Sequence, residues 1–291
     1  MFIKKIAHKI FNKILFLFYV DQWTIFYTNN IEAFKNFSLL KEIKPPIDRL
    51  YADPFIVKND KGYIIFFEEL IFLHKKGHIS ALEIDKNGIV SNPKKVLEKD
   101  YHLSYPYVFK YKNDYFMIPE TKNNKTIELY KSHNFPYKWE FQKNLMESIS
   151  AVDSSLFFYN NKWWLFSNIA INEGDSTWDS LYLFYADNFM TDSWNPHPLN
   201  PIVKDLSSAR PAGRIYMTED GPIRPSQNCE QRYGYSINLN KIVTLNENSY
   251  EEILLEEIKP KGINGLRGTH TFNYEDDIYV TDGLIRRKKY K

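Results

Sequence analysis

The chain has 291 residues, 43% of them hydrophobic and 25% charged, a composition that excludes both wholesale disorder and a polytopic membrane protein. Its 38 Lys and Arg residues nearly balance its 36 Asp and Glu residues, and the resulting net charge of +2 argues against a nucleic-acid-binding function. The single cysteine, Cys229, excludes a disulfide within the chain, and no Cys/His cluster has structural-zinc spacing, so we expect a reducing compartment and no metal or other cofactor.

The first 20 residues combine apolar side chains with four lysines, Lys4, Lys5, Lys9 and Lys13. This basic amphipathic pattern predicts a short N-terminal helical extension that either packs on the rest of the protein or lies on an anionic membrane surface. The apolar run 14–20 is too short to cross a bilayer, and Asp21 follows where a secretory signal would have small residues. We assign residues 1–45 to the amphipathic extension and lead-in, and we expect a cytoplasmic protein, with peripheral contact to the inner membrane as a further possibility.

Residues 46–291 form the main domain, in which one β-hairpin recurs five times at intervals of roughly 50 residues. Each copy has two strand-forming runs joined by a turn rich in Asn, Asp or Gly. The turns are Asn59-Asp60-Lys61-Gly62, Asn113-Asp114, Asn160-Asn161, Glu219-Asp220-Gly221 and Asp276-Asp277. The fourth copy is the weakest, because Pro222 is a poor residue for a central strand.

Further strand-forming runs, such as residues 79–84, 126–130 and 181–185, lie between the hairpins. Each repeat therefore has material for about four strands. Five such units in series predict an all-β fold, a five-bladed β-propeller, with the first strand of each blade lining a central channel. A pair of β-sandwiches is the alternative.

In a propeller, the residue just before each innermost strand lies at the channel mouth, where side chains from distant parts of the sequence converge. These positions hold Asp53, Tyr105, Asp153, Arg210 and His270. An isolated Asp at the start of a strand usually caps a turn, but equivalent placement in two blades favours a joint catalytic role for Asp53 and Asp153. Two facing carboxylates suit sugar chemistry, in which one acts on the anomeric carbon or a water and the other tunes or exchanges protons.

Polar residues also follow the second strands of the hairpins. Glu120 follows an apolar strand and is the best candidate for a catalytic acid, with a loop-anchoring carboxylate as an equal alternative. Glu68 and Glu69 are weaker candidates; we expect Glu69 to contact substrate, together with Tyr105 and Gln227. Five residues, unless they simply pair with acidic residues, offer a basic sector suited to phosphate or carboxylate: Arg210, Arg214, Arg224, Arg267 and His270.

Beyond residue 45, the chain resembles the N-terminal domain of plant glucosamine inositolphosphorylceramide transferases and its stand-alone bacterial relatives. The resemblance rests on segments of the sequence that are specific when taken together: Ala52-Asp53-Pro54-Phe55, His102-Leu103-Ser104-Tyr105-Pro106-Tyr107-Val108-Phe109, Met117-Ile118-Pro119-Glu120, Phe135-Pro136-Tyr137-Lys138-Trp139, Trp194-Asn195-Pro196-His197-Pro198-Leu199-Asn200-Pro201 and Ala209-Arg210-Pro211-Ala212-Gly213-Arg214.

That domain in turn is similar to the five-bladed, furanosidase-type propellers of glycoside hydrolase family 43. The similarity implies that Asp53 matches the catalytic base and Asp153 the residue that modulates the pKa of the acid. The fourth blade departs from the pattern, because Arg210 and Arg214 stand where those hydrolases present a glutamate as general acid.

An arginine in place of the acid suits a phosphate leaving group, which leaves without protonation and is held by guanidinium groups. We therefore expect a glycosyltransferase that uses a phosphate-linked sugar donor and a glycan acceptor in bacterial surface glycan synthesis. The alternatives are a glycoside hydrolase, in which Glu120 or another carboxylate supplies the acid, and a non-catalytic sugar-binding module.

Overall fold

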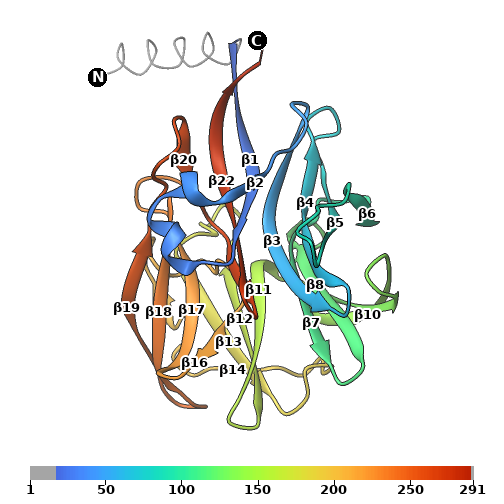
Figure 1. Cartoon of the computed structure of the whole chain (residues 1–291). Coiled ribbons are helices and arrows are strands. Elements are labelled where there is room, and N and C mark those ends of the chain that lie inside the picture. Colours follow the sequence, from blue (N-terminus) through green and yellow to red (C-terminus); the bar gives the residue numbers. More distant parts are fainter. Residues whose placement is uncertain (1–17, 290–291) are drawn as a thin grey trace.

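The strand-forming runs of the sequence form five antiparallel sheets in the computed structural model, which describes residues 18–289 (Figure 1). The other described elements are three short 3-10 helices, η1 (Ile31–Lys35), η2 (Phe37–Leu39) and η3 (Lys122–Asn124). Each sheet is one blade, so the expected all-β fold with five propeller blades is confirmed.

The first four blades follow the order of the chain. The first contains β3 (Arg49–Asn59), β4 (Gly62–Ile71), β5 (Gly77–Asp85) and β6 (Lys94–Leu97), and the second β7 (Ser104–Tyr111), β8 (Asp114–Thr121), β9 (Thr126–Asn134) and β10 (Lys138–Glu147). The third contains β11 (Ser150–Tyr159), β12 (Lys162–Ala170), β13 (Ser180–Ala186), β14 (Asn195–Pro196) and β15 (Val203–Lys204). The fourth contains β16 (Tyr216–Thr218), β17 (Gly221–Asn228), β18 (Ser236–Leu245) and β19 (Tyr250–Ile258).

The inner edge of the fourth blade is irregular, as its weak hairpin pattern suggested. Regular pairing with β17 covers only β16, and a single bridge joins Pro211 to Ser226 further along. Proline cannot donate a ladder hydrogen bond, so Pro211 and Pro222 limit how far this strand can pair.

The fifth blade is completed by the beginning of the chain. It contains β20 (Leu266–Gly268), β21 (Phe272–Glu275) and β22 (Ile278–Lys288), and its outer strands are β1 (Tyr19–Thr28) and β2 (Lys41–Ile43). β1 pairs with β22 over ten positions. The lead-in, which we placed outside the repeat, therefore supplies two strands of the last blade, because closing the ring removes exposed sheet edges.

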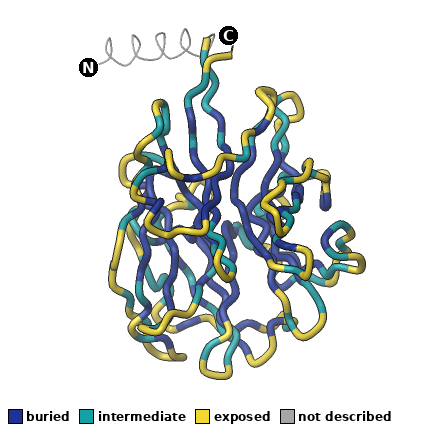
Figure 2. The backbone as a smooth tube through the Cα atoms, in the orientation of Figure 1, coloured by how far each residue is buried: buried dark blue, intermediate teal, exposed yellow. Residues whose placement is uncertain are grey.

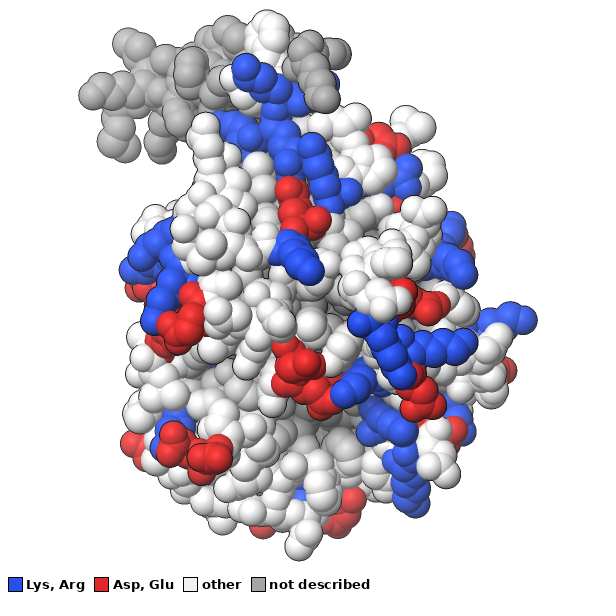
Figure 3. Space-filling model, viewed as in Figure 1, with Lys and Arg blue, Asp and Glu red and all other residues white. Residues whose placement is uncertain are grey.

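Most of the expected N-terminal helical extension, residues 1–17, lies outside the described residues. From Tyr19 onward the chain is not helical but forms the strand β1. No helix among residues 18–289 is long and apolar enough to cross a membrane. Lys and Arg side chains gather around the free ends of β1 and β22, with acidic side chains among them (Figure 3). Asp21 pairs there with Arg267 and Arg286, and Glu42 with Arg287.

Apolar side chains from neighbouring blades form five buried clusters, while the loops and outer edges are exposed (Figure 2). Both faces of a blade are therefore buried, which explains why several strands are apolar nearly throughout rather than alternating. This packing holds the inner strands in place around the channel.

A bulge interrupts the innermost strand of the first three blades at the same point. Pairing slips between Ala52 and Phe55, between Ser104 and Tyr107, and between Val152 and Ser155. Within these bulges, left-handed backbone is found at three non-glycine residues: Asp53 (φ 53°), Tyr105 (φ 43°) and Asp153 (φ 53°). Such backbone costs roughly 1–3 kcal/mol per residue and concentrates at functional sites, where a bulge re-aims a side chain.

Candidate active site

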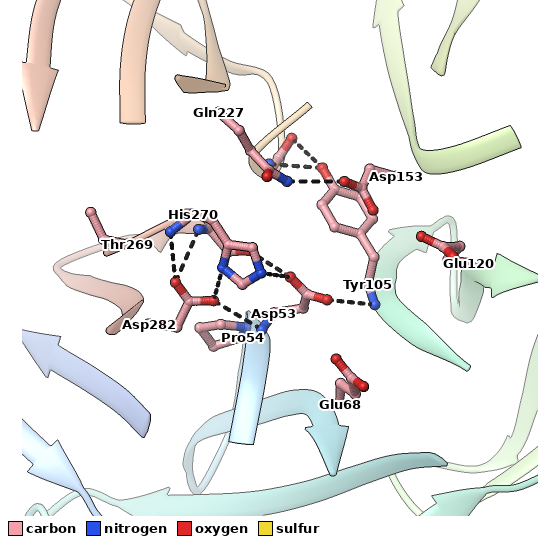
Figure 4. Close-up of polar contacts among 12 residues, drawn as sticks. Asp53, Pro54, Glu68, Tyr105, Glu120, Asp153, Gln227, Thr269, His270 and Asp282 are labelled. Atoms are coloured by element: carbon pink, nitrogen blue, oxygen red, sulfur yellow. Dashed lines mark hydrogen bonds and ion pairs between the residues drawn. The ribbon is translucent and has the colours of Figure 1, made fainter. Parts of the chain in front are cut away.

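The bulged innermost strands and the second strands beside them direct carboxylates into a common space. Figure 4 shows Asp53, Glu68, Glu120 and Asp153 facing this space from three different blades. All four are buried or nearly so, and the Arg210 and His270 side chains join them. We call this set of six residues the polar funnel.

Asp53 is held on both carboxylate oxygens. Its Oδ1 accepts a hydrogen bond from the Thr271 hydroxyl (2.8 Å) and lies 3.5 Å from Nε2 of His270. Its Oδ2 accepts from the backbone N–H of Tyr105 (3.2 Å). Burial raises the pKa of Asp53 to about 6, an effect that the His270 charge opposes. At neutral pH, Asp53 is therefore an ionised carboxylate with the basicity that a general base needs.

Asp282 holds Asp53 and His270 in position. It is fully buried, and its carboxylate accepts the backbone N–H groups of His270 (2.8 Å), Thr271 (3.2 Å) and Asp53 (3.1 Å). It also lies 2.6 Å from Nδ1 of His270, which fixes the imidazole with Nε2 toward Asp53. Burial alone would lower the pKa of His270, but the Asp282 and Asp53 charges outweigh it and raise that pKa.

Asp153 fixes the arginine of the fourth blade. Its Oδ2 lies 2.6 Å from Nε of Arg210 and also accepts a hydrogen bond from the Gln227 amide (3.0 Å). Arg210 Nη1 donates to the carbonyl of Thr177 (3.3 Å), and Nη2 lies 3.9 Å from Glu120, beyond hydrogen-bond distance. One edge of the guanidinium therefore stays available to an anion in the funnel.

Glu68 and Glu120 occupy the same register position of successive blades, Glu68 opposite Ala52 and Glu120 opposite Ser104. Burial, reinforced by the Asp153 charge, raises the pKa of Glu120 to about 8. Burial and the Asp53 charge also hold the pKa of Glu68 well above its ordinary range. Glu120 is therefore protonated at neutral pH and can donate a hydrogen bond or a proton.

The structure brings together most of the residues that the sequence singled out. The Tyr105 hydroxyl lies 2.9 Å from Oγ of Ser155 and accepts a hydrogen bond from the Gly213 backbone (2.7 Å). Its fully buried side chain joins three blades, so its expected contact with substrate is corrected to a supporting role, with its backbone N–H on Asp53.

Three expected substrate-binding residues lie away from the funnel. Glu69 borders a separate cavity of about 580 Å³, where Arg49 and Ser80 donate hydrogen bonds to it. Burial would raise the pKa of Glu69, but these contacts and His78 lower it to about 2. Arg214 donates to Glu275 and to the carbonyl of Val108.

Arg224 is fully buried against Glu252 (Nε to Oε2, 2.7 Å) and the carbonyl of Ser208. These three side chains join blades or strands, which is the alternative that the sequence left open for the cations. None of the contacts that fix them involves a funnel residue.

Sequence reasoning missed three residues that contact His270, namely Asp282, Trp23 and Tyr233. It also preferred Glu69 to Glu68. The register shared with Glu120 could have identified Glu68. Trp23 is on the strand that closes the ring from the N-terminus, and its ring stacks on His270 at 4.0 Å between centroids. No local pattern in the sequence indicates that contact.

Asp53, His270 and Asp282 each offer one possible metal-ligand atom, and these atoms lie within 4.8 Å of one another. In the structure each of these groups already has protein partners, and both oxygens of Asp282 are engaged. A cation would therefore have to displace the contacts that orient His270.

The chain matches the family model described as glucosamine inositolphosphorylceramide transferase 1, N-terminal, over residues 42–280. Over 241 residues it is 34% identical to glucosamine inositolphosphorylceramide transferase 1 of Oryza sativa subsp. japonica, covering 80% of this chain and 32% of that protein. The Arabidopsis thaliana protein of the same name is 28% identical over 230 residues, covering 77% of this chain and 30% of its own length. The chain thus spans about a third of the length of the curated relatives it matches.

Solved structures share the fold. A family 117 glycoside hydrolase of the marine bacterium Zobellia galactanivorans aligns with a TM-score of 0.57 and 10% identity, over 91% of this chain and 90% of its own. An exo-1,5-α-L-arabinanase from a bovine ruminal metagenomic library aligns with a TM-score of 0.52 and 15% identity, over 84% of this chain and 95% of its own. At these identities the similarity concerns the propeller alone.

Proposed function

Because the chain belongs to the family defined by the N-terminal region of glucosamine inositolphosphorylceramide transferase 1, we propose that it is a carbohydrate-active enzyme that transfers a sugar from a phosphate-linked donor to a glycan acceptor. The observation that carries the proposal is Arg210, a buried cation held by Asp153 at 2.6 Å within the carboxylates of the funnel. The names of the plant relatives support a glucosamine-type sugar.

In the proposed reaction, Asp53 takes the proton of the acceptor hydroxyl as its oxygen bonds to the anomeric carbon. The bond between that carbon and the phosphate oxygen breaks, and its electron pair leaves with the phosphate. Arg210 stabilises the charge that develops there, so the leaving group needs no proton. His270, held charged by Asp282, stabilises the ionised form of Asp53 before the proton arrives.

Glu120 supports a second candidate, glycoside hydrolysis. A carboxylic acid with a pKa of about 8 remains protonated at neutral pH and could protonate a sugar leaving group, while Asp53 activates water. The third candidate is a sugar-binding module without catalysis, which fits a chain that covers only 32% of its rice relative.

The dependence of kcat/KM on pH separates transfer from hydrolysis. Asp53 must be ionised in either reaction, so the rate should rise as the pH increases through about 6. Transfer from glucosamine 1-phosphate should then stay level as Glu120 loses its proton near pH 8, because phosphate leaves unprotonated. Hydrolysis that uses Glu120 as its acid should instead fall above pH 8.

Glu120→Gln provides the matched control for that profile. The variant should retain most transfer and lose any hydrolysis. A bell-shaped profile for the phosphate-linked donor, together with loss of turnover in Glu120→Gln, would contradict transfer and favour the hydrolase.

We also propose a cytoplasmic location with peripheral contact at an anionic membrane. The four lysines among apolar residues in the first 20 positions support the membrane contact. The single cysteine supports a reducing compartment such as the cytoplasm. Synthesis of a bacterial surface glycan would place the acceptor near that membrane.

A further inference from the structure

Aromatic residues line one part of the polar funnel without belonging to the core. Trp23, Trp178 and Tyr233 are in none of the five apolar clusters that hold the blades together. Most other tryptophans, such as Trp163 and Trp164, pack into those clusters. Core packing therefore does not account for the placement of these three rings.

The three rings form a continuous series through His270. Trp178 lies 5.7 Å from Tyr233 between ring centroids, Tyr233 lies 5.4 Å from His270, and His270 lies 4.0 Å from Trp23. The guanidinium carbon of Arg210 lies 4.9 Å from the Tyr233 ring centroid. The series thus leads from His270 in the funnel, past Arg210, to Trp178, a residue that is 38% exposed.

Local structure fixes the positions of Tyr233 and Trp178. Gly234 has φ 61°, and a Cβ atom there would lie 3.0 Å from the Trp23 ring and 3.1 Å from Cβ of His270. A side chain at this position would therefore displace the turn that presents Tyr233. Trp178 follows Thr177, whose carbonyl accepts a hydrogen bond from Arg210 Nη1 at 3.3 Å.

Tyr233 also lies close to the catalytic carboxylates. Burial raises the pKa of its hydroxyl well above the ordinary value, and the Asp53, Asp153 and Glu120 charges act in the same direction while Arg210 opposes them. Its ring centroid lies 4.9 Å from the guanidinium carbon of Arg210 and 5.4 Å from the His270 ring centroid, so Tyr233 stands beside two cationic residues of the funnel.

We propose that Trp178 and Tyr233 form the binding platform for the pyranose ring of the donor sugar, next to the phosphate position at Arg210. This inference rests on the proposed function and adds the part of the site that recognises the sugar itself. The C–H groups on one face of a pyranose are apolar and slightly positive, and they match the negative face of an aromatic ring. The arrangement divides recognition: Arg210 takes the phosphate, and the aromatic pair takes the ring.

Calorimetric titration of the full chain with three separate probes tests this division. The probes are glucosamine 1-phosphate, glucosamine and inorganic phosphate. Trp178→Ala should weaken binding of both sugars by about tenfold, because an aromatic contact contributes roughly that much, and should leave inorganic phosphate binding unchanged. Phe158→Ala is the matched control: Phe158 is an exposed aromatic residue (53%) beside the hairpin turn of the same blade, and its loss should affect no probe.

Trp178→Phe keeps an aromatic face and supplies a second readout. Sugar binding should change tryptophan fluorescence in the wild type, whereas Trp178→Phe should retain most of the affinity and lose that change. Unchanged sugar affinity in Trp178→Ala would overturn the platform and leave the carbohydrate site standing. An equal loss of phosphate binding would also overturn it, because Trp178 would then act through Arg210. A wild-type protein that binds neither sugar would contradict the proposed function itself.

Discussion

Asp53→Asn is expected to lower turnover by about 10³-fold while leaving the free energy of unfolding within about 1 kcal/mol of wild type. The loss follows from removing the only charge on the proposed base, and steady-state kinetics with glucosamine 1-phosphate would measure it. Asn tolerates left-handed backbone better than other residues with a Cβ atom, so it can adopt the φ of 53° found here. Its amide oxygen can still accept from Thr271 or Tyr105.

Stability should not suffer, because burial disfavours the ionised form of Asp53 in the folded protein. A folded-state pKa raised to about 6 means that the ionised group opposes folding as the pH rises above the ordinary value of 3.8. Removing the charge relieves that cost, and His270 keeps its contact with Asp282.

Asp276→Asn is the matched control for Asp53→Asn. Asp276 has nearly the same backbone, φ 52°, but it lies in the turn between β21 and β22 and pairs with Lys58. That variant should turn over substrate like wild type. Full activity in Asp53→Asn would show that Asp53 is not the catalytic base, and would favour a sugar-binding module without catalysis at this site.

Arg210→Met is expected to weaken binding of glucosamine 1-phosphate by roughly 2–5 kcal/mol while leaving binding of glucosamine nearly unchanged. The reason is that a charge-assisted contact in a buried site disappears, whereas contacts to the sugar ring remain. Calorimetry with both ligands would measure the contrast. Equal losses of affinity for both ligands would show that Arg210 supports the folded structure of the site rather than contacting the phosphate.

The same substitution leaves Asp153 buried without its cation, which is expected to cost roughly 3–5 kcal/mol of stability. The double variant Arg210→Met with Asp153→Asn removes both charges and should recover much of that loss in denaturant unfolding. Phosphate affinity should stay low in the double variant. Recovery of phosphate binding together with stability would contradict a direct contact between Arg210 and the donor.

Repetition in the sequence predicted the blades and the convergence of Asp53 with Asp153, because equivalent positions of a propeller meet at one channel. The same logic assigns Glu68, which is opposite Ala52 as Glu120 is opposite Ser104. The alternation of apolar and polar residues along β4 could not show whether Glu68 or Glu69 faces the funnel, because both faces of that strand are buried. Only the register of the hairpin separates them.

Contacts between distant strands could not be predicted in this way. Arg224 resembled a funnel residue, but its partner Glu252 comes from β19, and no local pattern pairs them. Trp23 reaches His270 because the first strand of the chain closes the last blade. A long charged side chain of a blade can reach the funnel or another strand, and the partner available there decides its role.

A crystal structure of the full-chain Asp53→Asn variant with glucosamine 1-phosphate would show directly whether a phosphate-linked sugar is held between Arg210 and residue 53. We expect density for the phosphate against the guanidinium of Arg210, with the anomeric carbon turned toward residue 53 and the ring along Tyr233. A phosphate bound away from the funnel, or a sugar in the funnel whose phosphate points to solvent, would contradict this arrangement.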